Sequence, residues 1–215
     1  MAKRVPRYKF DKLSNKATKN ALRLHFDSIL LYRNKSFPTA FHIAILALEE
    51  LAKSRWIDRY VFYSETNNTW FKEDQEQSWL QLLYMHTKKQ AAFVEQEFHE
   101  ISPKFYQFVR NGQLEMKKQK AIYVGLEKNK RKININSKIS TPDQIKLKDA
   151  KQIISLNNDV LIALCDHNSK SDHLVGPAFK YHLLNTQMCV FLKEEWRFRS
   201  GLLGKKWQTY RKKSN

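Results

Sequence analysis

A carboxylate and an ammonium group stand four residues apart in the most apolar helix that the sequence predicts. The segment 40–56 reads AFHIAILALEELAKSRW, and its Glu49 and Lys53 have the order that favours a helical ion pair. At about 100° per residue they share one stripe with His42, Trp56 and Tyr60. A helix that is apolar on nearly every side is normally buried, and buried charges need partners. The stripe is therefore either a structural polar network or a functional site.

Histidines beside cations form the second set of residues with chemical potential. His86 is followed closely by Lys88 and Lys89 in the sequence HTKK. One group that takes and gives protons, next to one that holds negative charge developing on phosphorus, would equip a metal-independent ribonuclease. His86 also falls on an apolar stripe, where a core histidine with satisfied hydrogen bonds is the simpler interpretation. The residue types alone leave both interpretations open.

Other common catalytic signatures do not occur in the sequence. It has no glycine-rich phosphate loop, no HExxH zinc helix and no GxSxG nucleophile turn. Its two cysteines, Cys165 and Cys189, have no partners at metal-ligand spacing and are expected to be buried free thiols. We therefore predict neither a metal nor a cofactor.

The charge of the chain indicates an acidic partner. Its 215 residues include 39 Lys plus Arg against 21 Asp plus Glu, a formal net charge of +18, which exceeds what solubility requires. Nucleic acid, an acidic protein and an anionic membrane surface all fit this charge. Because there is neither a secretory signal nor an apolar run of about 18 residues, we expect a cytoplasmic protein without a membrane segment.

The spacing of apolar residues predicts a mainly α-helical single domain spanning residues 1–215. Helices are predicted over about 11–33, 37–63, 73–101, 104–110, 141–165 and 176–192. The helical core covers about 11–195, with a short basic arm before it and a basic tail after it. The least helical region, about 121–138, favours a small extended or hairpin insertion. Its cations are either a solvated loop or a phosphate-binding patch: Lys128, Lys130, Arg131 and Lys132.

Several segments resemble one protein family. They are FPTAFHIAILALEELAK in the second predicted helix, NALRLHFDSILLY in the first, MHTKK in the third, and KAIYVGL before a Thr-Pro helix start. Together they resemble the AbiV-type abortive infection proteins, a branch of the HEPN superfamily. The resemblance covers roughly residues 12–165, and the EELAK helix is its most specific part.

The resemblance implies a compact helical bundle, typically a homodimer, that defends bacteria against phage. Such proteins are held inactive and arrest protein synthesis once a phage component activates them. Many HEPN relatives cleave RNA with an arginine followed four to six residues later by a histidine. This chain has no such pair, and the nearest substitute is Asn168 with His173. The resemblance makes His86 with Lys89, and Glu49 with Lys53, the other catalytic candidates.

Two functions remain as expectations. The first is an antiphage effector that stops translation by binding or cleaving RNA, after activation by a phage-encoded protein. The second is a non-enzymatic basic module that blocks an acidic protein or the ribosome by occupancy. A plain basic adaptor without toxicity is a third, blander interpretation. The residues alone leave open whether the protein is an enzyme.

Overall fold

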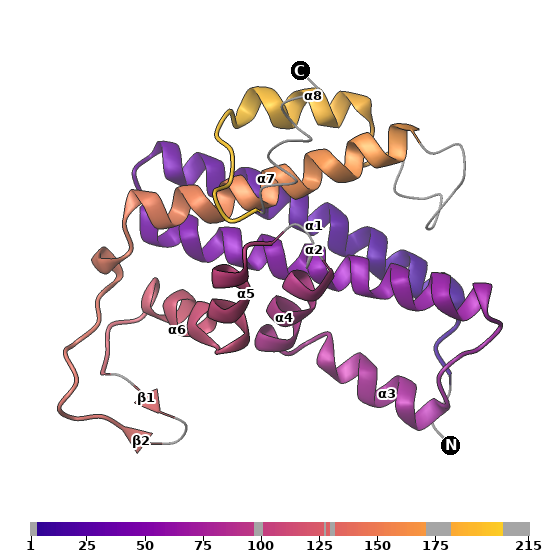
Figure 1. Cartoon of the computed structure of the whole chain (residues 1–215), viewed down its shortest axis with the longest axis horizontal. Coiled ribbons are helices and arrows are strands. Elements are labelled where there is room, and N and C mark those ends of the chain that lie inside the picture. Colours follow the sequence, from indigo (N-terminus) through magenta and orange to yellow (C-terminus); the bar gives the residue numbers. More distant parts are fainter. Residues whose placement is uncertain (1–3, 97–100, 127, 130–131, 171–181, 204–215) are drawn as a thin grey trace.

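Two long helices form the centre of the molecule. The computed structural model describes residues 4–96, 101–126, 128–129, 132–170 and 182–203. Helices α1 (Arg7–Arg33) and α2 (Phe37–Thr66) are joined by a three-residue turn and pack along their length (Figure 1). Helix α1 thus begins earlier than the predicted residue 11. Pro38 lies in the first turn of α2, where a missing N–H is tolerated.

Shorter helices cover both sides of this pair. Helices α7 (Leu147–Lys170) and α8 (Thr186–Glu195) lie on one side. Helices α4 (His86–Gln96), α5 (Pro103–Arg110) and α6 (Gln113–Lys120) lie on the other (Figure 1). The main core fills the space between them, with buried residues such as Phe41, Ile45, Leu48, Phe93, Ile154 and Leu161. The predicted all-α bundle is confirmed.

The third predicted helix is broken, which corrects the expectation of one helix over 73–101. Helix α3 (Glu73–Leu82) ends in a turn at 83–85, and α4 then starts at His86. Leu83 packs with Trp79 and Phe10 in a separate small core, where α1 begins and α2 ends. Phe93 packs in the main core. The break allows α3 and α4 to pack in different cores. The sequence does not predict this break, because residues 83–85 contain neither Gly nor Pro.

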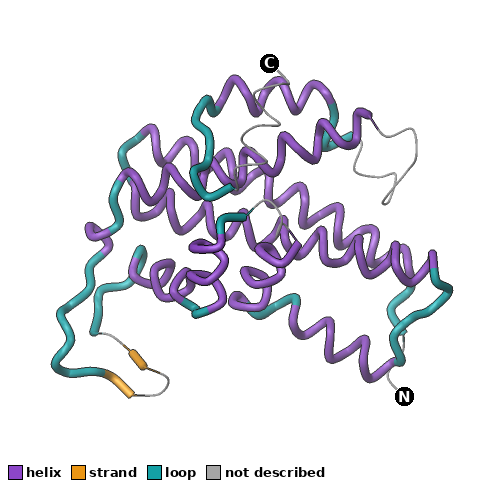
Figure 2. Tube along the Cα trace, viewed as in Figure 1, coloured by secondary structure: helices purple, strands orange, loops and turns teal. Residues whose placement is uncertain are grey.

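The predicted insertion is a thin arm that extends from the bundle (Figure 2). Strands β1 (Lys128–Asn129) and β2 (Lys132–Ile133) pair antiparallel, and a further bridge joins Gly125 to Ser140 at the base of the arm. The chain then passes through a 3₁₀ helix, η1 (Pro142–Gln144), before α7 begins. The small extended or hairpin insertion expected near 121–138 is thus confirmed, and it is a hairpin.

The last helix starts later than the prediction of a helix over 176–192 requires, because the described residues 182–185 are not helical. Helix α8 starts at Thr186, where the side chain of Asn185 accepts a hydrogen bond from the N–H of Met188. The predicted start at 176 lies outside the described residues. Cys165 and Cys189 are buried thiols that form no disulfide, as expected. Among the described helices, none is long and apolar enough to span a bilayer.

Candidate active site

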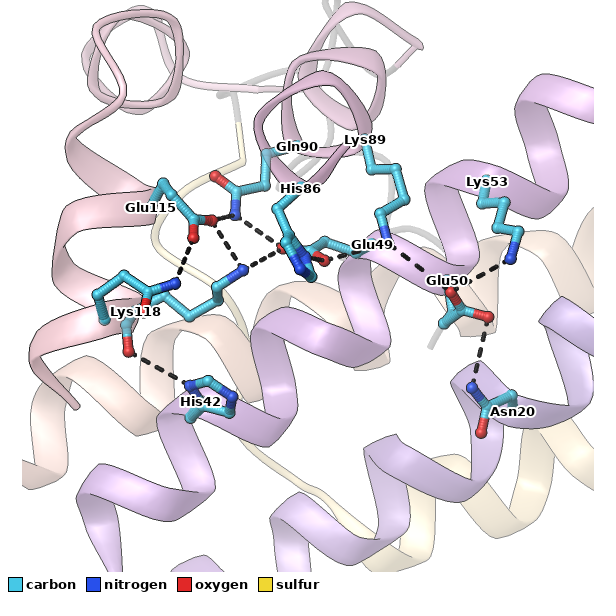
Figure 3. Close-up of polar contacts among 11 residues, drawn as sticks. Asn20, His42, Glu49, Glu50, Lys53, His86, Lys89, Gln90, Glu115 and Lys118 are labelled. Carbon is cyan, nitrogen blue, oxygen red and sulfur yellow. Dashed lines mark hydrogen bonds and ion pairs between the residues drawn. The ribbon is translucent and has the colours of Figure 1, made fainter. Parts of the chain in front are cut away.

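A completely buried carboxylate lies at the centre of the candidate site. Glu49 of α2 faces the helices α4 and α6, and Figure 3 shows the polar side chains that converge on it. Its Oε2 accepts a hydrogen bond from His86 Nδ1 at 2.6 Å. Its Oε1 accepts from Gln90 Nε2 at 2.8 Å and from Lys118 Nζ at 2.9 Å. Lys89 Nζ lies 3.4 Å from Oε2. The charge that seemed anomalous in an apolar helix is therefore fully compensated.

Helix α4 supplies three of these partners, because the period of an α-helix brings them to one face. His86, Lys89 and Gln90 are spaced by three and four residues, so they share one face of the helix. The start of α4 is fixed by the carbonyl of Met85, which accepts hydrogen bonds from the N–H groups of Lys88 and Lys89. Because the helix breaks before His86, this residue is the first of α4 and does not lie in the middle of a longer helix.

Helix α6 supplies the remaining cation. Gly112, with φ of 71°, allows the chain to turn into α6, and Lys118 is buried on the inner face of that helix. Lys118 Nζ also contacts Glu115 Oε2 at 2.7 Å, so one ammonium group joins two carboxylates. The carbonyl of Lys118 accepts a hydrogen bond from His42 Nδ1 at 3.3 Å. His42 therefore holds α6 against α2 and does not contact Glu49.

The second carboxylate of the cluster is ionised. Burial raises the pKa of Glu115, but hydrogen bonds from Lys118, Gln119 and Gln90 and the charge of Lys118 outweigh it. The pKa of Glu115 consequently lies below its ordinary value. Gln90 Nε2 donates to Glu115 Oε2 at 2.7 Å as well as to Glu49, which ties the two carboxylates together.

Lys53 has a different partner from the predicted one. Its Nζ lies 3.7 Å from Oε1 of Glu50, and Lys89 reaches the same oxygen at 3.9 Å. The expected ion pair with Glu49 is wrong, because His86, Lys89 and Lys118 surround that carboxylate. Lys53 nevertheless stays in the same cluster through Glu50 and Lys89 (Figure 3).

The charges of the cluster balance when the histidine is neutral. Three ammonium groups face three carboxylates, namely Lys53, Lys89 and Lys118 with Glu49, Glu50 and Glu115. An ionised Glu49 can only accept hydrogen bonds, so Nδ1 of His86 carries the hydrogen and Nε2 of a neutral ring keeps its lone pair. The His86 side chain is 51% exposed, whereas that of Glu49 is 1% exposed. Half of the His86 side chain is therefore open to solvent, while its Nδ1 is held by a buried carboxylate.

The other predicted residues are not brought to this cluster. Asn168 lies near the end of α7, on the opposite side of the hairpin, and His173 lies outside the described residues. Lys128 and Lys132 are in the two strands of the arm, whereas Lys130 and Arg131 lie outside the described residues. No metal-binding arrangement of three or more His, Cys, Asp or Glu side chains occurs within the described part of the chain.

Sequence reasoning missed Lys118, Glu115 and Gln90. Lys118 and Glu115 belong to a short and mostly polar helix, in which a buried lysine has no distinctive pattern. The spacing of Gln90 from His86 was a usable signal, since residues four apart share a helix face. Its role became apparent only from the contact with the two carboxylates.

Comparison with known proteins adds a family match. The family model HEPN_AbiV, described as AbiV, matches residues 9–162. This range contains every residue of the cluster around Glu49. No curated protein and no solved structure matches the chain.

Proposed function

The chain belongs to the AbiV family of the HEPN superfamily, whose role is abortive infection against phage, and on this premise we propose that it stops translation by cleaving RNA. In this proposal a phage component activates the protein, and His86 is the catalytic base. Arrest of protein synthesis would then follow from loss of intact RNA.

The observation that carries the proposal is the pairing of His86 with Glu49. A buried carboxylate that accepts the Nδ1 hydrogen fixes the tautomer and orientation of an imidazole, and it stabilises the imidazolium that forms after proton transfer. The ring is half exposed, so its Nε2 can meet a substrate from solvent. A histidine that served only the core would have no need of such access.

The reaction that fits these groups needs no cofactor. Nε2 of His86 takes the proton of an RNA 2′-hydroxyl, and the 2′-oxygen attacks the adjacent phosphorus. The bond from phosphorus to the 5′-oxygen breaks, and that oxygen leaves with a proton from solvent. The products are a 2′,3′-cyclic phosphate end and a 5′-hydroxyl end, and His86 returns its proton to water.

The net positive charge of the chain supports RNA as the substrate. Lys89 and Lys53 lie in the same cluster, and the chain carries a net charge of +18. Positive charge attracts the phosphate backbone irrespective of base sequence. These lysines would replace the arginine that many HEPN ribonucleases place before their histidine, although an ammonium group cannot bind phosphate in the bidentate way of a guanidinium.

Incorporation of labelled amino acids after phage infection tests the proposal in cells. Cells with the wild-type protein are expected to stop incorporation, whereas cells with His86→Gln at the same protein level continue it. Lys88→Gln is the neighbouring control, because Lys88 is exposed on the same helix turn, and this variant should still arrest synthesis. Arrest by His86→Gln equal to that of the wild type would contradict a catalytic role.

The exposed apolar side chains of the arm favour a second candidate function. Among the described residues of the arm and its base, seven large apolar side chains are more than a third exposed: Ile122, Tyr123, Val124, Leu126, Ile133, Ile135 and Ile139. Exposed apolar surface of this kind marks interaction sites. A module that blocks an acidic protein or the ribosome by occupancy would use it. Translation arrest that requires one protein per ribosome would support this candidate, and arrest at trace dose would contradict it.

A further inference from the structure

An exposed tyrosine stands beside the cluster and has no role in the reaction described above. Tyr84 lies in the turn between α3 and α4, and it is 68% exposed. Its neighbour Leu83 is completely buried and anchors the turn to the small core. The backbone around Tyr84 is thus held firmly while most of its aromatic ring faces solvent.

A lysine from the central helix positions this ring. Lys53 Nζ lies 5.2 Å from the centre of the Tyr84 ring, within the range of a cation–π interaction. Lys53 is in turn held by Glu50 at 3.7 Å, and its side chain is 12% exposed. The ring therefore has one ordered cationic neighbour and keeps a large open surface.

The ring lies close to the proposed catalytic base. Tyr84 and His86 are two residues apart, so their Cα atoms are separated by about 7 Å at most. The connection also runs through side chains, since Lys53 and Lys89 share Glu50, and Lys89 and His86 share Glu49. The Tyr84 ring is therefore connected to the His86 imidazole through one continuous set of paired side chains.

We propose that Tyr84 is a stacking platform for an unpaired base of single-stranded RNA, next to the nucleotide that His86 attacks. This inference rests on the proposed function and narrows its substrate to unpaired RNA. Proteins bind single strands by stacking bases on exposed aromatic rings, with cations nearby for the backbone. Bases within a duplex are already stacked on each other and cannot offer a face to the ring.

Binding of a short fluorescent RNA to the full-length protein tests this inference. All variants carry His86→Gln, so that the RNA stays intact during the measurement. Tyr84→Ala is expected to weaken binding of the single strand about tenfold, because stacking on one aromatic ring contributes roughly that factor. Tyr84→Phe keeps the ring and should bind within about twofold of the parent. The same RNA annealed to its complement should bind equally to all three proteins.

The matched control is Tyr63→Ala. Tyr63 is 63% exposed on α2, but it lies ten residues beyond Lys53, about 15 Å along the helix. If Tyr84→Ala binds the single strand as well as the parent, or if Tyr63→Ala loses as much affinity, the stacking platform is wrong while RNA cleavage stands. If the parent binds no RNA in either form, also in an extract of phage-infected cells, both the platform and the proposed function are wrong.

Discussion

His86 Nδ1 donates a 2.6 Å hydrogen bond to Glu49 Oε2, which joins an imidazole at the surface to a carboxylate inside the bundle. The two residues come from different helices, and the turn at 83–85 brings the N-terminal end of α4 to α2. The buried partner holds the ring through its Nδ1, and half of the exposed partner's side chain faces solvent. The proposed chemistry depends on both roles: Glu49 orients the imidazole, and His86 takes the proton.

Replacing Glu49 by glutamine tests whether Glu49 acts by orienting His86. We expect Glu49→Gln to lower kcat for RNA cleavage by about 10²–10⁴-fold, because an amide neither fixes the tautomer nor stabilises the imidazolium. KM should change little, since Glu49 is completely buried and a substrate that arrives from solvent cannot reach it. Glu50→Gln is the control, because Glu50 contacts Lys53 and Lys89 but not His86. A large rise in KM with unchanged kcat would contradict the positioning role.

Lys118 should be important for stability because it is a buried cation between two carboxylates. We expect Lys118→Met to lower the free energy of unfolding by about 3–5 kcal/mol, since it leaves Glu49 and Glu115 with less compensation. Adding Glu115→Gln should restore part of this loss. Lys117→Met provides the control, because the Lys117 to Asp149 pair is partly exposed and should contribute about 1 kcal/mol or less.

Urea unfolding of the four proteins measures these differences. The contradictory result would be a Lys118→Met protein as stable as Lys117→Met. An equal loss in the single and double variants would show that Glu115 does not couple to Lys118.

How far the sequence predicts this site depends on what each residue contacts. Glu49 and His86 could be singled out because a charge in an apolar helix, and a histidine beside lysines, are visible in the order of residues. The partner of Lys53 could not, because the rule for residues four apart considers one helix alone. In the folded protein, neighbouring helices bring His86, Lys89 and Lys118 to Glu49 and leave Lys53 to Glu50.

The fold shows the same distinction between local and tertiary information. The hairpin of α1 and α2 and the small strand insertion followed from apolar spacing and turn residues. The break between α3 and α4 did not, since Leu83 and Phe93 suit one continuous helix until they are assigned to different cores.

His25 should make the stability of the bundle depend on pH. Burial lowers the pKa of His25 from 6.5 to about 4, and the hydrogen bond with Asn158 offsets only part of this effect. The unfolded chain therefore binds a proton at a higher pH than the native protein does. The free energy of unfolding is therefore not reduced by His25 above pH 6.5. It decreases progressively as the pH falls to about 4, by about 3 kcal/mol in total.

Unfolding measured between pH 7 and pH 4 in the wild type and in His25→Gln checks this prediction. The variant should lose less stability than the wild type over this interval, because it lacks the titrating ring. Parallel losses in both proteins would assign the acid sensitivity to other groups.

The two cysteines should be unreactive in the native protein. Burial raises the pKa of Cys165 to about 12, and the pKa of Cys189 is also raised by burial and by a hydrogen bond to Asp166. Because the thiolate is the reactive form, a thiol reagent at pH 8 should label neither residue quickly. Both should react once the protein is unfolded in urea. Rapid labelling of the native protein would contradict the buried packing of α7 against α8.

The most direct measurement maps RNA ends in an extract of phage-infected cells to which purified protein is added. The account predicts new 2′,3′-cyclic phosphate ends and 5′-hydroxyl ends with the wild-type protein, and none with His86→Ala at the same concentration. Intact RNA in an extract whose translation has stopped, or equal cleavage by His86→Ala, would contradict the claim that His86 and Glu49 form a ribonuclease site.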